Sequence, residues 1–244
     1  MRSFFKAGNI KLRSNNTAYL EVSRLSDLKT VIIPHFDKYP LLTHKRADFE
    51  LFKMAIELII NKEHLTEEGL NKIASLKASM NKGLSDSLKD SFSDITVSQR
   101  PLVEQEKNFD PNWLAGFTSG EGCFFVDMYK AKTKSGYITR LKFILTQHSR
   151  DIELMRSLVN YLGCGVIYAD SKKPIVNITV SKLEDINNKI IPLLASSLQG
   201  NKVLDFVDFC KVADLMKNKI HLTEEGVDQI RKIKAGMNRG RYLG

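Results

Sequence analysis

An internal repeat constrains the fold of this 244-residue chain more than any other feature. Residues 61–84, NKEHLTEEGLNKIASLKASMNKGL, match residues 218–241, NKIHLTEEGVDQIRKIKAGMNRGR, almost continuously and without gaps. Further upstream, VSRLSDLKTVIIP ending at Pro34 matches VSKLEDINNKIIP ending at Pro192. A match that extends over so many positions indicates one structural unit used twice.

The two copies of the unit differ in extent. The second copy has a front segment, NWLAGFTSGEGCFFV at residues 112–126, for which the first copy shows no counterpart, because its match begins near Ile10. We therefore predict an N-terminal repeat over residues 1–84 that lacks its front helix and first two strands, and a complete C-terminal repeat over residues 112–244. Residues 85–111 are polar, rich in serine and without a sustained period, which predicts a surface linker.

The second copy has the pattern of an α+β unit. Asn112 is the expected N-cap of a short helix over residues 113–120, and Gly122 permits a sharp exit from that helix. Apolar and polar residues alternate over residues 138–147, the period of two of a half-buried strand, and residues 165–180 read as a hairpin. The order helix, two strands, helix, two strands, helices predicts an antiparallel β-saddle backed by helices.

The charge of the chain favours a polyanionic partner. Its formal net charge is +9 and its isoelectric point is near 9.3, values typical of proteins that bind DNA, RNA or anionic membranes. No apolar run approaches the roughly 18 residues of a membrane span, so we expect a soluble chain with no membrane partner. Cys123, Cys164 and Cys210 are odd in number and lack CxxC spacing, which argues against a disulfide framework and a zinc cluster.

One face of each predicted sheet is basic and polar. Arg140 and Lys142 share a face of their strand, and Lys11 and Arg13 share a face in the first copy. A twisted antiparallel ribbon with such a face can enter a major groove, where these side chains reach base edges. A solvated sheet face without a partner is the simpler interpretation of either strand alone, whereas two basic faces in a duplicated unit favour duplex binding.

The segment before Glu121 is rich in small residues. Ala115, Gly116, Ser119 and Gly120 form two small-residue pairs four positions apart, so another backbone could approach this helix closely. Glu121 follows at the helix end, where an opposed partner would place a second carboxylate, and two such acids can hold divalent cations that hydrolyse phosphodiesters. From spacing alone, a solvated helix-end acid beside a tight turn is the better-supported interpretation.

WLAGFTSGEGCFFV resembles the signature of LAGLIDADG homing endonucleases, specifically the fungal mitochondrial single-chain type with two pseudo-repeats joined by a linker. The similarity extends over essentially the whole chain and includes ILTQHSRD, YLGCG, KIIP and both HLTEEG segments. It implies a saddle of strands on double-stranded DNA and two signature helices at the domain interface, each giving one metal-binding acid. It further implies site-specific double-strand cleavage by Mg²⁺-dependent hydrolysis.

The resemblance also implies roles for individual residues. Glu121 matches the catalytic, metal-binding acid, and the carbonyl of Gly120 would be an additional metal ligand. Gln147 matches a polar residue near the attacking water, and Lys202, with Lys45 in the first copy, matches the basic residue near the scissile phosphate. Without the resemblance, Gln147 could be a polar strand end and either lysine a surface charge. The implied base-reading face comprises Cys123, Phe125, Asp127, Tyr129, Ile138, Arg140, Lys142, Ile144 and Thr146, with Lys11, Arg13, Asn15, Tyr19 and Glu21 in the first copy.

The sequence departs from the family pattern in containing one signature helix, over residues 113–121, instead of two. Three interpretations remain open: a truncated or degenerate copy that cuts nothing, a homodimer paired through this helix, or a second polypeptide that supplies the missing segment. A nuclease-inactive protein that binds RNA, such as an intron maturase or a ribonucleoprotein component, is the alternative function. A basic protein without any nucleic-acid role is the third.

Overall fold

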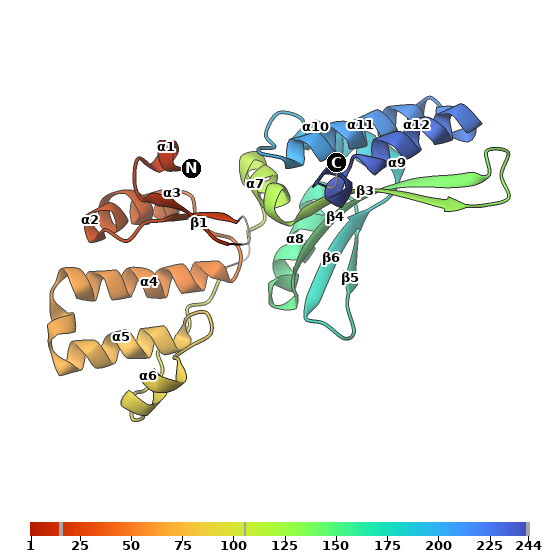
Figure 1. Cartoon of the computed structure of the whole chain (residues 1–244). Coiled ribbons are helices and arrows are strands. Elements are labelled where there is room, and N and C mark those ends of the chain that lie inside the picture. The colour runs from red at the N-terminus through yellow and green to blue at the C-terminus, as the bar shows by residue number, and fades with distance from the viewer. Residues whose placement is uncertain (15–16, 105, 243–244) are drawn as a thin grey trace. The chain divides into compact units, whose positions relative to one another are not determined.

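The computed structural model describes residues 1–14, 17–104 and 106–242. These residues form two compact units, Met1–Glu104 and Gln105–Gly244 (Figure 1). Within the described ranges, no helix combines the length and the apolar composition needed to cross a bilayer. All three cysteines are free and half-buried.

The second unit alternates helices and strand pairs in the predicted order. Its elements are α7 (Pro111–Glu121), β3 (Gly122–Lys130), β4 (Tyr137–His148), α8 (Ile152–Leu162), β5 (Val166–Ala169), β6 (Ile175–Val180), α9 (Leu183–Asp185), a π-helical turn (Ile186–Ile190), α10 (Ile191–Leu194), α11 (Lys202–Lys217) and α12 (Glu224–Ala235), with 3₁₀ turns at Ser149–Asp151, Ile220–Leu222 and Asn238–Tyr242. The strands form one antiparallel sheet in the order β3-β4-β6-β5. The α+β class expected from the sequence is therefore confirmed.

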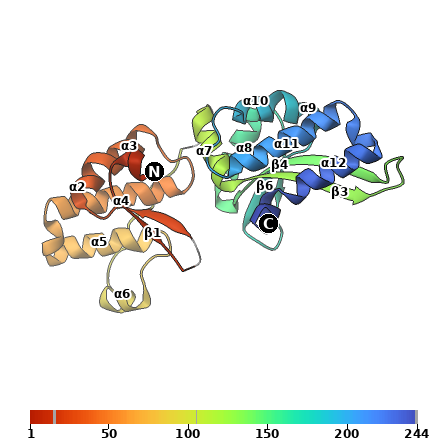
Figure 2. The ribbon, with the colours of Figure 1, turned by 45° about the horizontal axis from the view of Figure 1, so that its top comes forward.

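The helices of this unit cover one face of the sheet. Figures 1 and 2 show α11 and α12 side by side on that face. Helices α8 and α11 make the contacts with the strands. Phe124 of β3 is fully buried there, with ring centroids 5.6 Å from Phe143 and 5.3 Å from Phe209. The alternation of strand side chains sends every second residue into this core, so the intervening residues point to the opposite face.

The first unit contains the equivalent of only part of this sheet among its described residues. Its elements are α1 (Arg2–Phe5), β1 (Asn9–Leu12), β2 (Ala18–Glu21), α2 (Leu25–Asp27), a π-helical turn (Leu28–Ile32), α3 (Ile33–Lys38), α4 (Lys45–Ile60), a 3₁₀ turn (Glu63–Leu65), α5 (Glu67–Ser79) and α6 (Asp86–Ser91). By the repeat, the β1–β2 pair corresponds to β5–β6. Ile10 of β1 is 60% exposed, and the residue that matches it, Ile167 of β5, is half-buried.

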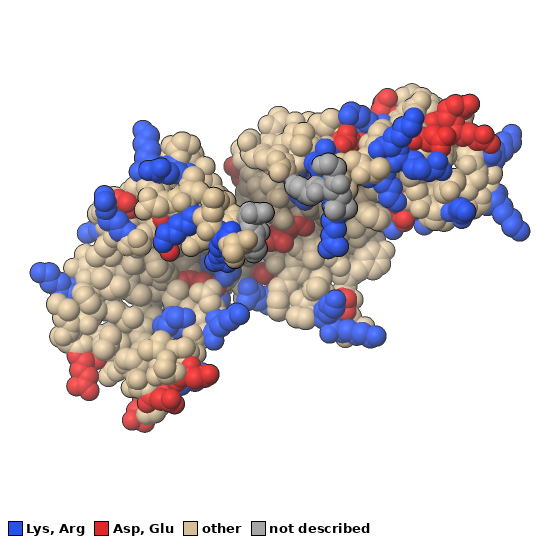
Figure 3. All heavy atoms as spheres, viewed as in Figure 1, with Lys and Arg blue, Asp and Glu red and all other residues tan. Residues whose placement is uncertain are grey.

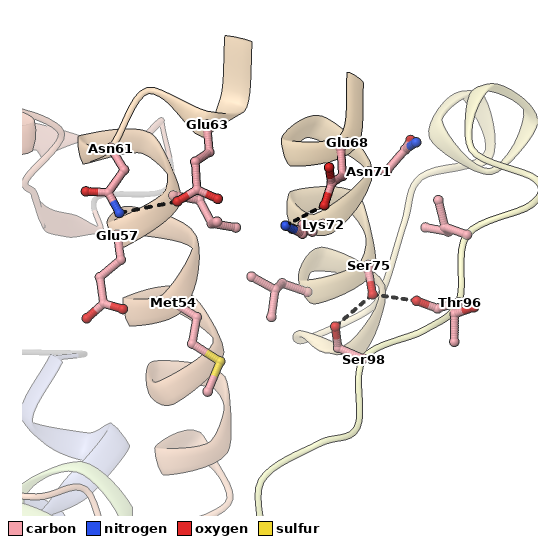
Figure 4. A pocket seen from close by; sticks show the side chains of 13 residues that line it. Met54, Glu57, Asn61, Glu63, Glu68, Asn71, Lys72, Ser75, Thr96 and Ser98 are labelled. Carbon is pink, nitrogen blue, oxygen red and sulfur yellow. Dashed lines mark hydrogen bonds and ion pairs between the residues drawn. The ribbon is translucent and has the colours of Figure 1, made fainter. Parts of the chain in front are cut away.

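Within the range expected to be a linker, residues 85–104 belong to the first compact unit and include α6. Residues 95–98 lie along α5, where the Ser75 and Ser98 hydroxyl oxygens are 2.7 Å apart at the edge of a groove lined by α4 and α5 (Figure 4). Arg100 then reaches back to the Asp48 carboxylate at 2.8 Å. These contacts are long-range, so the local composition of the segment did not reveal them.

Asp48 makes the stability of the first unit depend on pH. Burial alone would raise the pKa of this carboxyl, but hydrogen bonds from Arg100 and the Asn81 amide, with the charges of Arg100 and Lys45, hold its pKa below the ordinary value. A carboxyl with a lowered folded-state pKa stabilises the fold above its unfolded pKa, and this contribution disappears as the pH falls through the folded value. In wild type, we expect the urea concentration at the unfolding midpoint of the first unit to decrease as the pH is lowered below about 4. In Asp48→Asn, we expect this decrease with pH to be less steep. Equal pH slopes in the two proteins would contradict this assignment.

Candidate nucleic-acid interface and active site

The helix that carries Glu121 is fixed at both ends by local chemistry. Its N-cap is Asp110, whose carboxylate accepts the Asn112 amide at 2.7 Å, and Pro111 occupies the first helical turn, where no donor is needed. The prediction of Asn112 as the cap was therefore wrong by two positions. At the other end, a Cβ on Gly122 would lie 2.5 Å from the Thr118 carbonyl oxygen. A glycine is thus required where α7 passes directly into β3.

The sides of α7 differ in character. Leu114 and Ala115 are buried in the core of the second unit, and the rings of Trp113 and Phe117 stack with centroids 5.0 Å apart. A Cβ built on Gly116 or Gly120 would meet no atom within 4 Å. The side of α7 that carries these two glycines therefore has room for another backbone to approach.

Glu121 is the last residue of α7, and its side chain is exposed. Its carboxylate makes no hydrogen bond or ion pair with another described residue, and it is open to solvent. Gly120 lies in the last turn, where carbonyl groups have no intrahelical donor. No cluster of three or more metal-ligating side chains occurs in the described ranges. One carboxylate and one carbonyl fit a hard cation that takes its remaining ligands from water and phosphate, as Mg²⁺ commonly does.

Gln147 lies near this helix end. The strand register places Leu145 opposite Gly122, and Gln147 follows two residues later on the same side of β4. It is half-buried, and its side-chain carbonyl accepts the His148 amide at 2.8 Å. The structure thus brings Gln147 to the same end of the sheet as Glu121.

Lys202 and Lys45 occupy matching places, each as the first residue of the long helix of its unit, α11 and α4. Lys202 lies close enough to the start of β3 for its positive charge to act on Cys123. Burial raises the pKa of the Cys123 thiol, and this charge opposes that rise. Lys45 is held within the first unit, where its ammonium donates to the Asn81 side chain at 3.0 Å and lies 3.7 Å from Asp48.

The residues expected to read bases in the second unit share the sheet face opposite the helices. The β3–β4 register pairs Phe125 with Lys142 and Asp127 with Arg140. The Lys142 ammonium forms a 2.9 Å ion pair with Asp127, and the Arg140 guanidinium lies 5.4 Å from the Tyr129 ring centroid. Cys123, Ile138, Ile144 and Thr146 lie on the same face, at every second position of β3 and β4.

This face extends onto strands that the site prediction omitted. Thr146 donates its hydroxyl to the Asn177 side chain at 2.7 Å, and Asn177 pairs with Tyr168 of β5. Tyr168 is 57% exposed, and Thr179 lies on the same face. The alternation of apolar and polar residues in residues 165–180 was the signal that could have assigned these residues to the interface.

The corresponding face of the first unit has the same mixture of basic, acidic and aromatic groups. Lys11 forms an ion pair with Glu21 and pairs in register with Tyr19, while the Arg13 guanidinium lies 4.9 Å from the Tyr19 ring centroid. Asn15 lies outside the described residues. Figure 3 shows lysine and arginine side chains spread over the visible surface of both units, with acidic side chains gathered in fewer places.

Comparison with known proteins gives the following matches. The model of the LAGLIDADG endonuclease family matches residues 1–56 and 114–213. Two curated relatives from Neurospora crassa, probable intron-encoded endonucleases 3 and 2, are 43% and 38% identical over 91% and 92% of the chain. The chain spans only 42% and 51% of the length of these relatives.

Solved structures match the chain over nearly its whole length. I-SmaMI bound to cleaved DNA has a TM-score of 0.96 and 46% identity, covering 98% of this chain and 81% of that one. I-LtrWI bound to its target DNA has a TM-score of 0.94 and 41% identity, with 98% and 81% coverage. I-SmaMI has also been solved on uncleaved DNA with calcium ions, and with two lysines replaced by alanine, singly and together.

Proposed function

Because the chain belongs to the LAGLIDADG endonuclease family, we propose that it binds double-stranded DNA over its two sheet faces and cleaves it by metal-dependent phosphodiester hydrolysis. The observation that carries the proposal is Glu121: an exposed carboxylate without a partner in the described residues, presented at a helix end beside a face of basic and aromatic side chains. A DNA-binding module without chemistry has no need for an anion at this place, since it repels phosphate.

The outer sheet faces provide the binding. Lysine and arginine on a twisted antiparallel sheet can contact phosphates and reach base edges in a major groove. The Lys142–Asp127 pair and the Arg140–Tyr129 contact hold these long side chains in defined directions. Such restraint lowers the entropy lost when the face meets DNA.

The chain's own residues would divide the chemistry among them. Glu121 and the Gly120 carbonyl would hold Mg²⁺, which when bound neutralises charge that develops on the scissile phosphate. Gln147, at the same end of the sheet, would orient the attacking water by a hydrogen bond. Lys202 in the second unit, and Lys45 at the matching place in the first unit, would each place positive charge beside a phosphate that its own unit contacts.

Within the described residues, α7 is the single helix that ends in an exposed acid beside small residues. We therefore propose that residues 1–244 by themselves supply one carboxylate and nick one strand, and that double-strand cleavage needs a second carboxylate from outside these residues. A supercoiled plasmid that contains the target distinguishes these cases, because a nick gives the open circle and a double-strand break gives the linear form.

We also propose a mitochondrial location. The supporting observation is that the relatives are intron-encoded proteins of fungi, among them a protein of the ND4 intron 1 of Podospora anserina, 48% identical over 28% of the chain.

The proposal is tested with a target selected by the protein itself from a pool of random DNA duplexes in Ca²⁺. The selected duplex is then incubated with Mg²⁺ and its strands are separated on a denaturing gel. Cleavage at a fixed position supports the nuclease. Salt-sensitive binding to structured RNA, without cleavage of DNA, would favour the maturase-like alternative, and binding that does not depend on salt would contradict a nucleic-acid role.

Lys142→Ala is expected to weaken binding of the selected duplex by about tenfold. It should also reduce the slope of log affinity against log salt concentration by about one. The reason is the loss of one phosphate-neutralising charge from the outer face. The measurement is fluorescence anisotropy in Ca²⁺ over a range of salt concentrations. Lys89→Ala is the matched control, because Lys89 makes an ion pair of the same 2.9 Å length with Asp86 on α6. Equal affinities for the two variants would contradict the assignment of Lys142.

A further inference from the structure

A buried aspartate occupies the same place in both units. Asp48 and Asp205 lie one helical turn after Lys45 and Lys202 and are 6% and 7% exposed. Each accepts a hydrogen bond from the backbone amide of an asparagine in the left-handed conformation: Asn81, with φ of 50° at 3.0 Å, and Asn238, with φ of 52° at 2.9 Å. A buried carboxylate is costly unless its oxygens are satisfied, so this contact fixes the asparagine backbone firmly.

An arginine completes each cluster, but the two arginines come from different places in the repeat. Arg100, which binds Asp48 at 2.8 Å, lies in the segment after α6, whereas Arg241, which binds Asp205 at 3.0 and 3.1 Å, follows Asn238 by three residues. The repeat match does not relate these two arginines. The same contact is therefore made in two independent ways, which indicates that the geometry itself is required and is not only a remnant of duplication.

The side chain of Asn81 contacts an active-site lysine, and the side chain of Asn238 contacts the strand that follows Glu121. The Asn81 side-chain oxygen accepts the Lys45 ammonium at 3.0 Å. The Asn238 side-chain amide donates to the Phe124 carbonyl at 3.0 Å, and its oxygen lies 3.9 Å from the Cys123 sulfur. Cys123 and Phe124 are the second and third residues after Glu121, so Asn238 binds β3 directly downstream of the acid.

We propose that Asn81 and Asn238 are positioning residues of this active site, held by Asp48 and Asp205. Asn81 directs Lys45 in the first unit, and Asn238 sets the start of β3, and with it Glu121, against the helix that begins at Lys202. The proposal rests on the proposed nuclease function for its effect on rate, while the contacts themselves can be tested without catalysis. Asparagine suits this role because it tolerates the left-handed conformation and carries both a donor and an acceptor.

The catalytic test uses Asn238→Gly and Asn81→Gly. Glycine keeps the positive φ and the backbone amide that binds the aspartate, and removes only the side-chain contacts. We expect the single-turnover cleavage rate at saturating DNA to fall at least about tenfold, while affinity in Ca²⁺ and the melting temperature stay at wild-type values. Lys219→Gly is the control, because Lys219 also has a positive φ of 61° and lies away from the site. A rate within twofold of wild type, or an equal loss in Lys219→Gly, would overturn the proposal.

The second test does not require the chain to bind or cut DNA. A failure to bind and cut DNA would reject the proposed nuclease function, and the contacts of the asparagines could still be tested. In Asn81→Gly, acetylation of Lys45 is expected to become several-fold faster than in wild type, relative to Lys53 of the same helix, which keeps its ion pairs with Asp37 and Glu50. In Asn238→Gly, maleimide labelling of Cys123 is expected to accelerate similarly relative to Cys210, whose pKa burial raises to about 11. Unchanged labelling of both residues would show that the asparagines hold neither group.

Discussion

Glu121→Gln is expected to slow strand cleavage by about 10³-fold, the effect of losing roughly 4 kcal/mol of transition-state stabilisation. The amide has the size of the carboxylate but lacks the charge that would attract the metal ion. Glu121 is exposed and makes no contact among the described residues, so the substitution removes no interaction from the fold. We therefore expect the melting temperature and the affinity for the selected duplex in Ca²⁺ to stay close to wild type.

The rates are measured under single-turnover conditions with saturating protein, so that binding does not limit them. Glu68→Gln provides the matched control, because Glu68 is an exposed acid on α5 that pairs with Lys72 and has no assigned role in the site. The control is expected to cleave at the wild-type rate. Cleavage by Glu121→Gln at the rate of this control would remove Glu121 from the mechanism.

Gly122→Ala is expected to destabilise the second unit by about 1–3 kcal/mol, the usual cost of forcing an extra methyl group into a packed site. Gly122 is buried, and the new Cβ would lie 2.5 Å from the Thr118 carbonyl oxygen and 2.6 Å from its methyl carbon. Relief of this clash must move the end of α7 or the start of β3. Both movements displace Glu121, so cleavage should fall further than stability alone explains, as seen by comparing urea unfolding with single-turnover rates.

Gly116→Ala is the control for Gly122→Ala, because a Cβ at residue 116 would meet no atom within 4 Å. Alanine is favoured over glycine in a helix, so the second unit should be unchanged or up to about 1 kcal/mol more stable. If Gly116→Ala nevertheless abolishes double-strand cleavage while nicking persists, another helix packs against α7. Wild-type stability of Gly122→Ala would contradict the steric argument.

The sequence predicted the parts of the fold that local periodicity determines. The strands over residues 122–130 and 137–148 follow an alternation of apolar and polar side chains, and a one-residue error in register would have reversed both faces. It did not predict the docking of the segment around Arg100, because the contact with Asp48 links residues 52 positions apart. Local composition carries no information about a partner at that distance.

The same distinction applies to the candidate site. The position of Glu121 at a helix-to-strand junction could be read from Gly120 and Gly122 on either side of it, whereas its role was implied only by the family resemblance. Asn238 was missed, because it reaches Phe124 across 114 residues of chain. The ion pair between Lys142 and Asp127 was also missed, although both residues were expected on the outer face.

The central claim is that this chain holds duplex DNA on its sheet faces and uses the end of α7 to hydrolyse it. Its most direct test is denaturing electrophoresis of the selected duplex, end-labelled on each strand in turn, after incubation with wild-type protein in Mg²⁺ or in Ca²⁺. We predict a cut at one phosphodiester of at least one strand in Mg²⁺. Strands that stay intact in Mg²⁺, on a duplex that the protein demonstrably occupies, would contradict the claim.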